Sequence, residues 1–76
     1  MYSANQLNDD GKMTMYPIKP TLKDLGAYIA RCNEKFGEKP EMIAIYRHRK
    51  FFGYYLLQND KLVRQGTFRL SKYIAI

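Results

Sequence analysis

Residues 21–36, TLKDLGAYIARCNEKF, have the clearest helical pattern in the chain. Their apolar positions recur at alternating spacings of three and four, which places them on one stripe of an α-helix: Leu22, Leu25, Ile29, Cys32 and Phe36. Thr21 can cap the first turn, with Asp24 as the acid of a capping box. Gly37 stands where a left-handed residue commonly ends a helix, and Pro40 prevents a restart. We therefore predict a helix over residues 21–36 that packs its stripe against another element.

The remainder of the chain has the pattern of an antiparallel sheet. Three segments are rich in β-branched and aromatic residues: MIAIYR (42–47), FFGYYLLQ (51–58) and KLVRQGTFRL (61–70). The dipeptides His48-Arg49 and Asn59-Asp60 separate them, and Asn-Asp suits the positive φ of a two-residue hairpin loop better than His-Arg does. Two such loops fix the register of all three strands by counting.

This register assigns side chains to the two faces of the predicted sheet. Ala44, Gly53 and Gly66 form a trough on one face, to which we assign the helix, unless the glycines mark β-bulges instead. Tyr55 lies opposite Arg64 on that face. The other face carries Ile43, Ile45, Phe52, Tyr54, Leu56 and Val63. One helix cannot cover both faces, so either the termini or a partner cover the second one.

The segments before the helix are less regular. Residues 1–11 are polar and aperiodic, and we expect a flexible N-terminal segment ahead of a single domain at 12–76. Residues 12–18, KMTMYPI, predict a short strand that Pro17 confines to a sheet edge, with Met13 and Met15 on one face. The tail SKYIAI (71–76) is a fourth strand or folds back over an open end. The predicted fold is α+β, one helix on a three- to four-stranded antiparallel sheet in the order (β)αβββ(β).

Length and cysteine content limit the class of protein. A chain of 76 residues has room for one modest core. The single Cys32 excludes an intramolecular disulfide, and on the helical stripe it is expected to be reduced and buried. No apolar run approaches the roughly 18 residues of a membrane span, and the start lacks the pattern of a signal peptide. We expect a soluble cytoplasmic protein with no membrane association.

The net charge of +6 is unevenly distributed. Residues 1–41 contain six Lys and Arg against six Asp and Glu, whereas residues 42–76 contain seven against Asp60 alone. The predicted sheet therefore carries the whole excess, which favours an anionic partner such as nucleic acid or an acidic protein.

Aromatic and basic residues alternate on the face of the predicted sheet away from the helix. Single-stranded nucleic acid is bound by aromatic side chains that stack on bases and by Lys or Arg that contact phosphates. The candidate binding residues are Arg47, Arg49, Lys50, Phe52, Tyr54, Lys61 and Arg69. We therefore expect a small non-enzymatic binding module, with single-stranded nucleic acid or RNA as the first candidate ligand. Two alternatives stay open: a regulator or inhibitor of the phage or plasmid type that binds protein or homodimerises through this face, or aromatic residues that are simply core.

A catalytic role has less support in the sequence. The hairpin tip Arg47-His48-Arg49-Lys50 could grip phosphates or present His48 as a general base. With Arg69 and Tyr54 it would supply the residue types of a small metal-independent ribonuclease, but shape alone is analogy. His48 has no second histidine, so no metal site or cofactor is expected.

Overall fold

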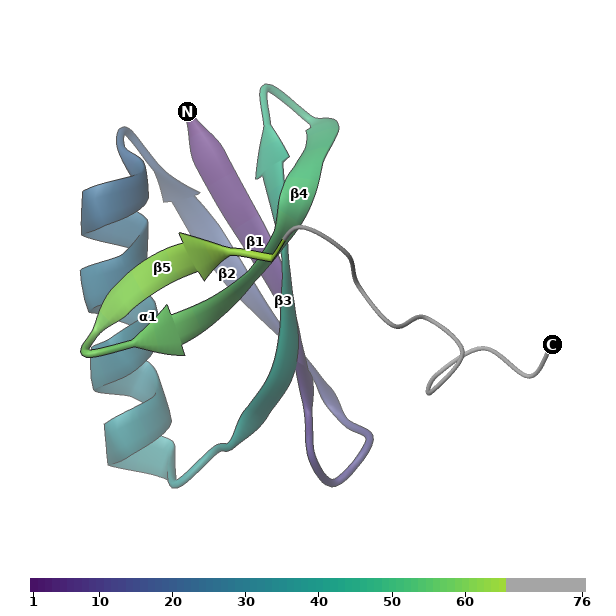
Figure 1. The fold of residues 1–76 in the computed structure, drawn as a ribbon, viewed down its shortest axis with the longest axis vertical. Helices are drawn as coiled ribbons and strands as arrows, with labels where there is room; N and C mark the ends of the chain where they lie inside the picture. Colours follow the sequence, from purple (N-terminus) through teal and green to yellow (C-terminus); the bar gives the residue numbers. More distant parts are fainter. Residues whose placement is uncertain (66–76) are drawn as a thin grey trace, which may run out of the picture.

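The computed structural model describes residues 1–65, which form two layers, helix α1 and one five-stranded antiparallel sheet (Figure 1). The elements are β1 (Tyr2–Asn8), β2 (Met13–Lys19), α1 (Leu22–Phe36), β3 (Pro40–Arg47), β4 (Lys50–Gln58) and β5 (Lys61–Arg64). The strand order in the sheet is β2-β1-β3-β4-β5. The predicted α+β class, one helix on an antiparallel sheet, is confirmed.

Strand β1 is the largest departure from the sequence-based prediction. It lies between β2 and β3 and pairs with both, so the expectation of a flexible segment over residues 1–11 is wrong for Tyr2–Asn8. Its buried side chains include Gln6 and Asn8, whose polarity hides the alternation that identifies a strand. The order is therefore ββαβββ. Strand β2 does lie at the edge of the sheet, as Pro17 requires.

Helix α1 begins and ends as its capping residues predict. The Thr21 side chain accepts a hydrogen bond from the Asp24 N–H at 3.1 Å, and Gly37 adopts φ 66°. Leu25 and Ile29 are fully buried, but Phe36 is 66% exposed, so its place on the buried stripe is wrong. Asn33 is buried in its stead. Cys32 is only partly buried, contrary to the expectation of full burial.

Both predicted hairpin loops are present. All four loop residues have positive φ: His48, Arg49, Asn59 and Asp60. The predicted register holds from β4 to β5, where Tyr55 lies opposite Arg64. Between β3 and β4 it holds only beside the loop, because the register shifts between Ile45 and Tyr46.

This irregularity exchanges the faces of β3. Ile45 pairs with Gly53 instead of Phe52, and a shift of one residue moves every following side chain to the other face. Ile43 and Ile45 therefore pack under α1, and Ala44 points away from it. The predicted trough of Ala44, Gly53 and Gly66 is wrong, and Gly66 lies outside the described residues, as do Arg69 and the predicted tail strand 71–76.

A close contact between helix and sheet occurs at Gly26. A Cβ at this position would lie 3.3 Å from Cγ of Leu62, so a glycine on α1, and not a glycine trough in the sheet, permits the tight approach to β5. The apolar core between the layers consists of Ala4, Tyr16, Leu25, Ile29, Ile43, Ile45 and Tyr55.

A buried polar cluster fills the space between α1 and the other half of the sheet. Gln6 Nε2 donates to Asn8 Oδ1 at 2.6 Å and to Asn33 Oδ1 at 2.7 Å, and Asn33 Nδ2 donates back to Gln6 Oε1 at 3.0 Å. Tyr16 OH donates to Asn33 Oδ1 at 3.1 Å. Thr14 Oγ1 and Asn8 Nδ2 both donate to Glu38 Oε2, at 2.6 and 2.9 Å. Strands β1 and β2, the helix and the loop after it are thereby joined by hydrogen bonds.

Candidate functional site

One end of the sheet gathers basic side chains from segments far apart in the sequence. In Figure 1 the chain start, the β3–β4 hairpin and the beginning of α1 all lie at the upper end of the molecule. Cross-strand pairing places Lys19, Tyr2, Arg47 and Lys50 in one row across β2, β1, β3 and β4. Directly paired residues share a face, so three cations and one aromatic ring stand side by side on the face that carries α1.

Two guanidinium groups lie against the aromatic rings next to this row. Arg47 is 5.9 Å from the ring centroids of both Tyr2 and Phe52, and Arg64 is 5.2 Å from that of Phe52. The rings of Tyr2 and Phe52 meet edge to face at 5.7 Å. We call this set the basic aromatic cluster: Tyr2, Lys19, Arg47, Lys50, Phe52 and Arg64.

Gly53 on β4 leaves room for the Arg64 side chain to cross this strand. A Cβ on Gly53 would lie 3.0 Å from Arg64 Nε, so the glycine leaves the space through which this side chain passes. Its guanidinium donates to the carbonyl oxygen of Phe52 at 2.9 Å. The contacts of Arg64 and Arg47 are thus with aromatic rings and a carbonyl, and not with carboxylates of the described residues. Their positive charge is not neutralised within this part of the chain.

The cluster extends the core past the beginning of α1. Tyr55, 5% exposed, lies parallel to Phe52 with 6.3 Å between centroids, whereas Phe52 and Tyr2 are partly exposed. Burial raises the pKa of Tyr55, and Arg64 acts in the opposite direction. The cluster is therefore anchored to rigid core on one side and open to solvent on the other.

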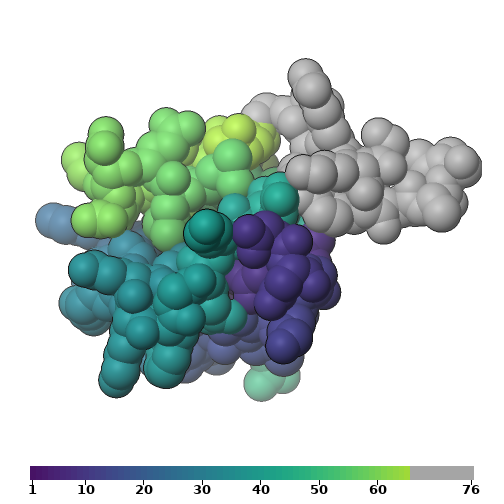
Figure 2. Space-filling view, turned by 90° about the horizontal axis from the view of Figure 1, so that it is seen from below, coloured from purple at the N-terminus to yellow at the C-terminus, as the bar shows by residue number. Residues whose placement is uncertain are grey.

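The opposite end of the molecule carries most of the acids. Figure 2 looks at this end, where the β1–β2 turn lies beside the segment that leaves α1. Asp9 N–H donates to the carbonyl oxygen of Lys39 at 2.8 Å, which holds the two segments together. The acids at this end are Asp9, Asp10, Glu34, Glu38 and Glu41. Lys12, Lys35 and Lys39 lie at the same end, so the acids exceed the lysines there by only five to three. The linear charge count did not predict this difference between the two ends of the strands.

The structure divides the binding residues that the sequence predicted. Arg47, Arg49 and Lys50 lie at the basic end, and Phe52 joins them there. Tyr54 lies on the opposite face of the sheet, against Phe51 at 4.8 Å, so the predicted pairing of Phe52 with Tyr54 is wrong. Lys61 is the first residue of β5 and pairs with Gln58 at the far end of β4. The predicted residue Arg69 lies outside the described residues.

Three members of the cluster are not among the residues predicted from the sequence: Tyr2, Lys19 and Arg64. Tyr2 was excluded because the N-terminal segment showed no periodicity. Arg64 could have been found, since the correct β4–β5 register already placed it opposite Tyr55 on the helix side.

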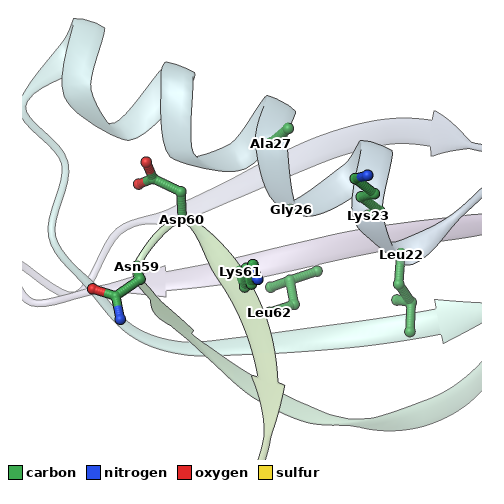
Figure 3. A pocket seen from close by; sticks show the side chains of 8 residues that line it. All are labelled: Leu22, Lys23, Gly26, Ala27, Asn59, Asp60, Lys61 and Leu62. Atoms are coloured by element: carbon green, nitrogen blue, oxygen red, sulfur yellow. The ribbon is translucent and has the colours of Figure 1, made fainter.

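A groove between α1 and the β4–β5 hairpin is a second concave feature (Figure 3). It has a volume of about 500 Å³, an apolar floor from Leu22, Gly26, Ala27 and Leu62, and a rim from Lys23, Asn59, Asp60 and Lys61. Cations and an acid share this rim, so it has no single charge preference. The groove lies at the tight contact of Gly26 with Leu62 and supplies no distinct chemistry.

Other candidate sites have structural explanations. Every buried polar side-chain atom of the described residues has a hydrogen-bond partner, so the buried polar cluster offers no free group to a ligand. His48 is exposed at the hairpin tip, where its backbone N–H donates to the Met1 carbonyl oxygen at 3.1 Å. Within residues 1–65, no three His, Cys, Asp or Glu side chains are grouped to hold a metal ion. Helix α1 does not have the length and apolarity needed to cross a membrane.

Comparison of the chain with protein-family profiles, curated sequences and solved structures finds no significant match. Function is therefore inferred from the chemistry of the basic end.

Proposed function

We propose that this protein is a non-catalytic module that binds single-stranded nucleic acid at the basic aromatic cluster. The observation that carries the proposal is the placement of Arg47 and Arg64 on the ring of Phe52, within a row of further cations and without carboxylate partners among the described residues.

The cluster combines the two contacts that single strands need. Exposed bases stack on aromatic rings or on guanidinium planes, and cations in reach of the same site neutralise the phosphates between bases. Phe52 and Tyr2 supply ring surface, and Lys19, Lys50 and the hairpin residue Arg49 supply charge. A row of side chains across four strands accommodates an extended backbone, whereas a duplex keeps its bases stacked inside and could use only the cations.

A ribonuclease has less geometric support than a binding module. Its candidates were His48, Arg47, Tyr54 and Arg69, and Tyr54 lies on the face opposite Arg47. A protein-binding regulator remains the second candidate, because the face that α1 leaves uncovered is apolar and exposed.

Fluorescence titration with labelled single-stranded RNA tests the proposal. Binding should weaken steeply between about 50 and 200 mM salt, because each neutralised phosphate releases counterions. Arg47→Gln and Lys50→Gln should each reduce the slope of log K against log salt by about 0.7, the contribution of one phosphate contact on a single strand. Lys35→Gln, an exposed lysine in the last turn of α1, is the matched control and should change neither slope nor affinity.

Stacking is tested separately from charge. Phe52→Leu keeps an apolar side chain but removes the ring, and it should cost about 1 to 3 kcal/mol of binding if a base stacks there. Circular dichroism establishes that the variant is folded. Equal affinity for polyglutamate and for RNA, or loss of affinity in Lys35→Gln equal to that in Lys50→Gln, would show that the cluster attracts anions of any kind and would contradict the proposal.

A further inference from the structure

The sheet face away from α1 carries apolar or aromatic side chains on all five strands, with the polar Ser3 and Asn5 of β1 among them. Cross-strand pairing places ten apolar or aromatic residues on this open face: Leu7, Met13, Met15, Met42, Ala44, Tyr46, Phe51, Tyr54, Leu56 and Val63. Met15 is 75% exposed, Met13 56% and Phe51 52%. An antiparallel sheet with one solvated face normally alternates apolar and polar residues, so apolar residues on both faces indicate a second covering layer.

The size of the open face is close to the lower limit of a specific protein interface. Five strands about 4.8 Å apart and about seven residues long span roughly 19 by 23 Å, or about 450 Å² in projection. Accessible area exceeds projected area because the side chains are rough, so the face approaches the roughly 600 Å² per partner at the lower limit of specific interfaces.

Residues 66–76 are too few to cover this face by themselves. Eleven residues would cover about 160 Å² as a helix about 16 Å long and 10 Å wide. As a single strand they would cover a stripe about 36 Å long and 5 Å wide, or about 180 Å². Either area is less than half of the open face.

A second copy of the chain supplies an apolar face of equal size, and its charged ends can be set opposite those of the first copy. The basic cluster and the acids Asp9, Asp10, Glu34, Glu38 and Glu41 lie at opposite ends of the strands. A two-fold axis between the faces and running across the strands sets the basic end of each copy beside the acidic end of the other. The methionines add adaptable contact surface, and sheets pack face to face in this manner in β-sandwiches.

We propose that the open face is the interface of a two-fold homodimer, in which two sheets pack face to face with their charged ends opposed. The helices and the basic aromatic clusters then lie on the outside of the dimer. This inference does not depend on nucleic-acid binding, since the cluster lies on the other face of the sheet.

Sedimentation of the full chain from micromolar to millimolar concentration measures the dimer directly. Met15→Lys should raise the dissociation constant of the dimer at least tenfold, because association would bury an unpaired charge. Met15 is mostly exposed in the single chain, so this variant should keep its fold, which circular dichroism checks. Phe36→Lys is the matched control: Phe36 is 66% exposed but belongs to α1, and its substitution should change the dissociation constant less than twofold.

Methionine oxidation followed by mass spectrometry identifies the occupant of the face. In a dimer, Met13 and Met15 should be oxidised more slowly as protein concentration rises. If Met13 and Met15 of a monomer were protected from oxidation equally at all protein concentrations, the chain would cover its own face, and the proposal would be overturned. A monomer with reactive Met13 and Met15, or a dimer that Met15→Lys leaves intact, would overturn it equally.

Discussion

The two halves of the layer between α1 and the sheet are equally buried but are stabilised in different ways. Over β3 and β4, Leu25 and Ile29 pack on Ile43, Ile45 and Tyr55. Removal of apolar surface from water drives this contact, and it does not require a particular orientation of the side chains. Over β1 and β2, Ala4 and Tyr16 adjoin buried polar side chains, and each of these must find a partner at hydrogen-bond geometry: Gln6, Asn8 and Asn33. The apolar half therefore depends on filled volume, whereas the polar half depends on complete hydrogen bonding.

The largest effect is expected in the apolar half. Ile29→Ala should lower the free energy of unfolding by about 2 to 5 kcal/mol, because it leaves a cavity beneath a fully buried side chain. Arg31→Ala, an exposed change two residues away, should stay within about 0.5 kcal/mol. Urea unfolding of both variants measures the difference, and similar losses would show that the buried side of α1 is misassigned.

In the polar half, hydrogen bonding and volume can be separated at Asn33. Asn33→Ala should destabilise the protein by about 1 to 3 kcal/mol, since Gln6 and Tyr16 lose a buried partner. Asn33→Leu fills a similar volume without hydrogen bonds and should be no better. If the leucine variant instead matched wild type in urea unfolding, filled volume alone would stabilise both halves. Hydrogen bonding would then not distinguish the polar half from the apolar half.

Tyr16 adds a pH dependence that belongs to the polar half alone. Burial, reinforced by the nearby Glu38, raises the pKa of Tyr16 from 10.0 to about 12. A raised pKa in the folded state means that the proton is held more tightly there than in the unfolded chain. The stabilisation is therefore complete below pH 10 and is lost as the pH rises toward 12.

Comparison with Tyr16→Phe isolates this contribution from the lysines, which titrate in the same range. The stability difference between wild type and Tyr16→Phe should change between pH 10 and 12 and be constant from pH 7 to 9. A difference that is constant over the whole range would show that this hydroxyl does not ionise with folding.

The smallest effect is expected at Phe36. Although it continues the apolar spacing of α1, it is 66% exposed, so Phe36→Ala should change the free energy of unfolding by no more than about 0.5 kcal/mol. A loss of stability as large as that of Ile29→Ala would show that Phe36 is buried, as the apolar spacing predicts, and that Asn33 is not on the buried side of α1.

The candidate site could be predicted only in part, and the reasons are physical. The hairpin residues Arg47, Arg49 and Lys50 were found because a charged two-residue loop between aromatic segments is a local signal. The partners of Phe52 were not, because one register shift beside Tyr46 decides which face each side chain occupies. Tyr2 was missed because its strand has buried amides in place of apolar residues.

The sequence by itself determined the helix with both its caps, the two hairpin loops, the β4–β5 register and the edge position of β2. These depend on interactions between residues near in the chain, such as Thr21 with Asp24, and on φ angles set by single residues such as Gly37. The tertiary structure decided the rest: the burial of Gln6 and Asn33, the place of β1 inside the sheet, and the gathering of Tyr2, Arg47 and Arg64 around Phe52. A buried amide is favourable only when a partner from another segment completes its hydrogen bonds, and a composition or spacing pattern does not contain that partner.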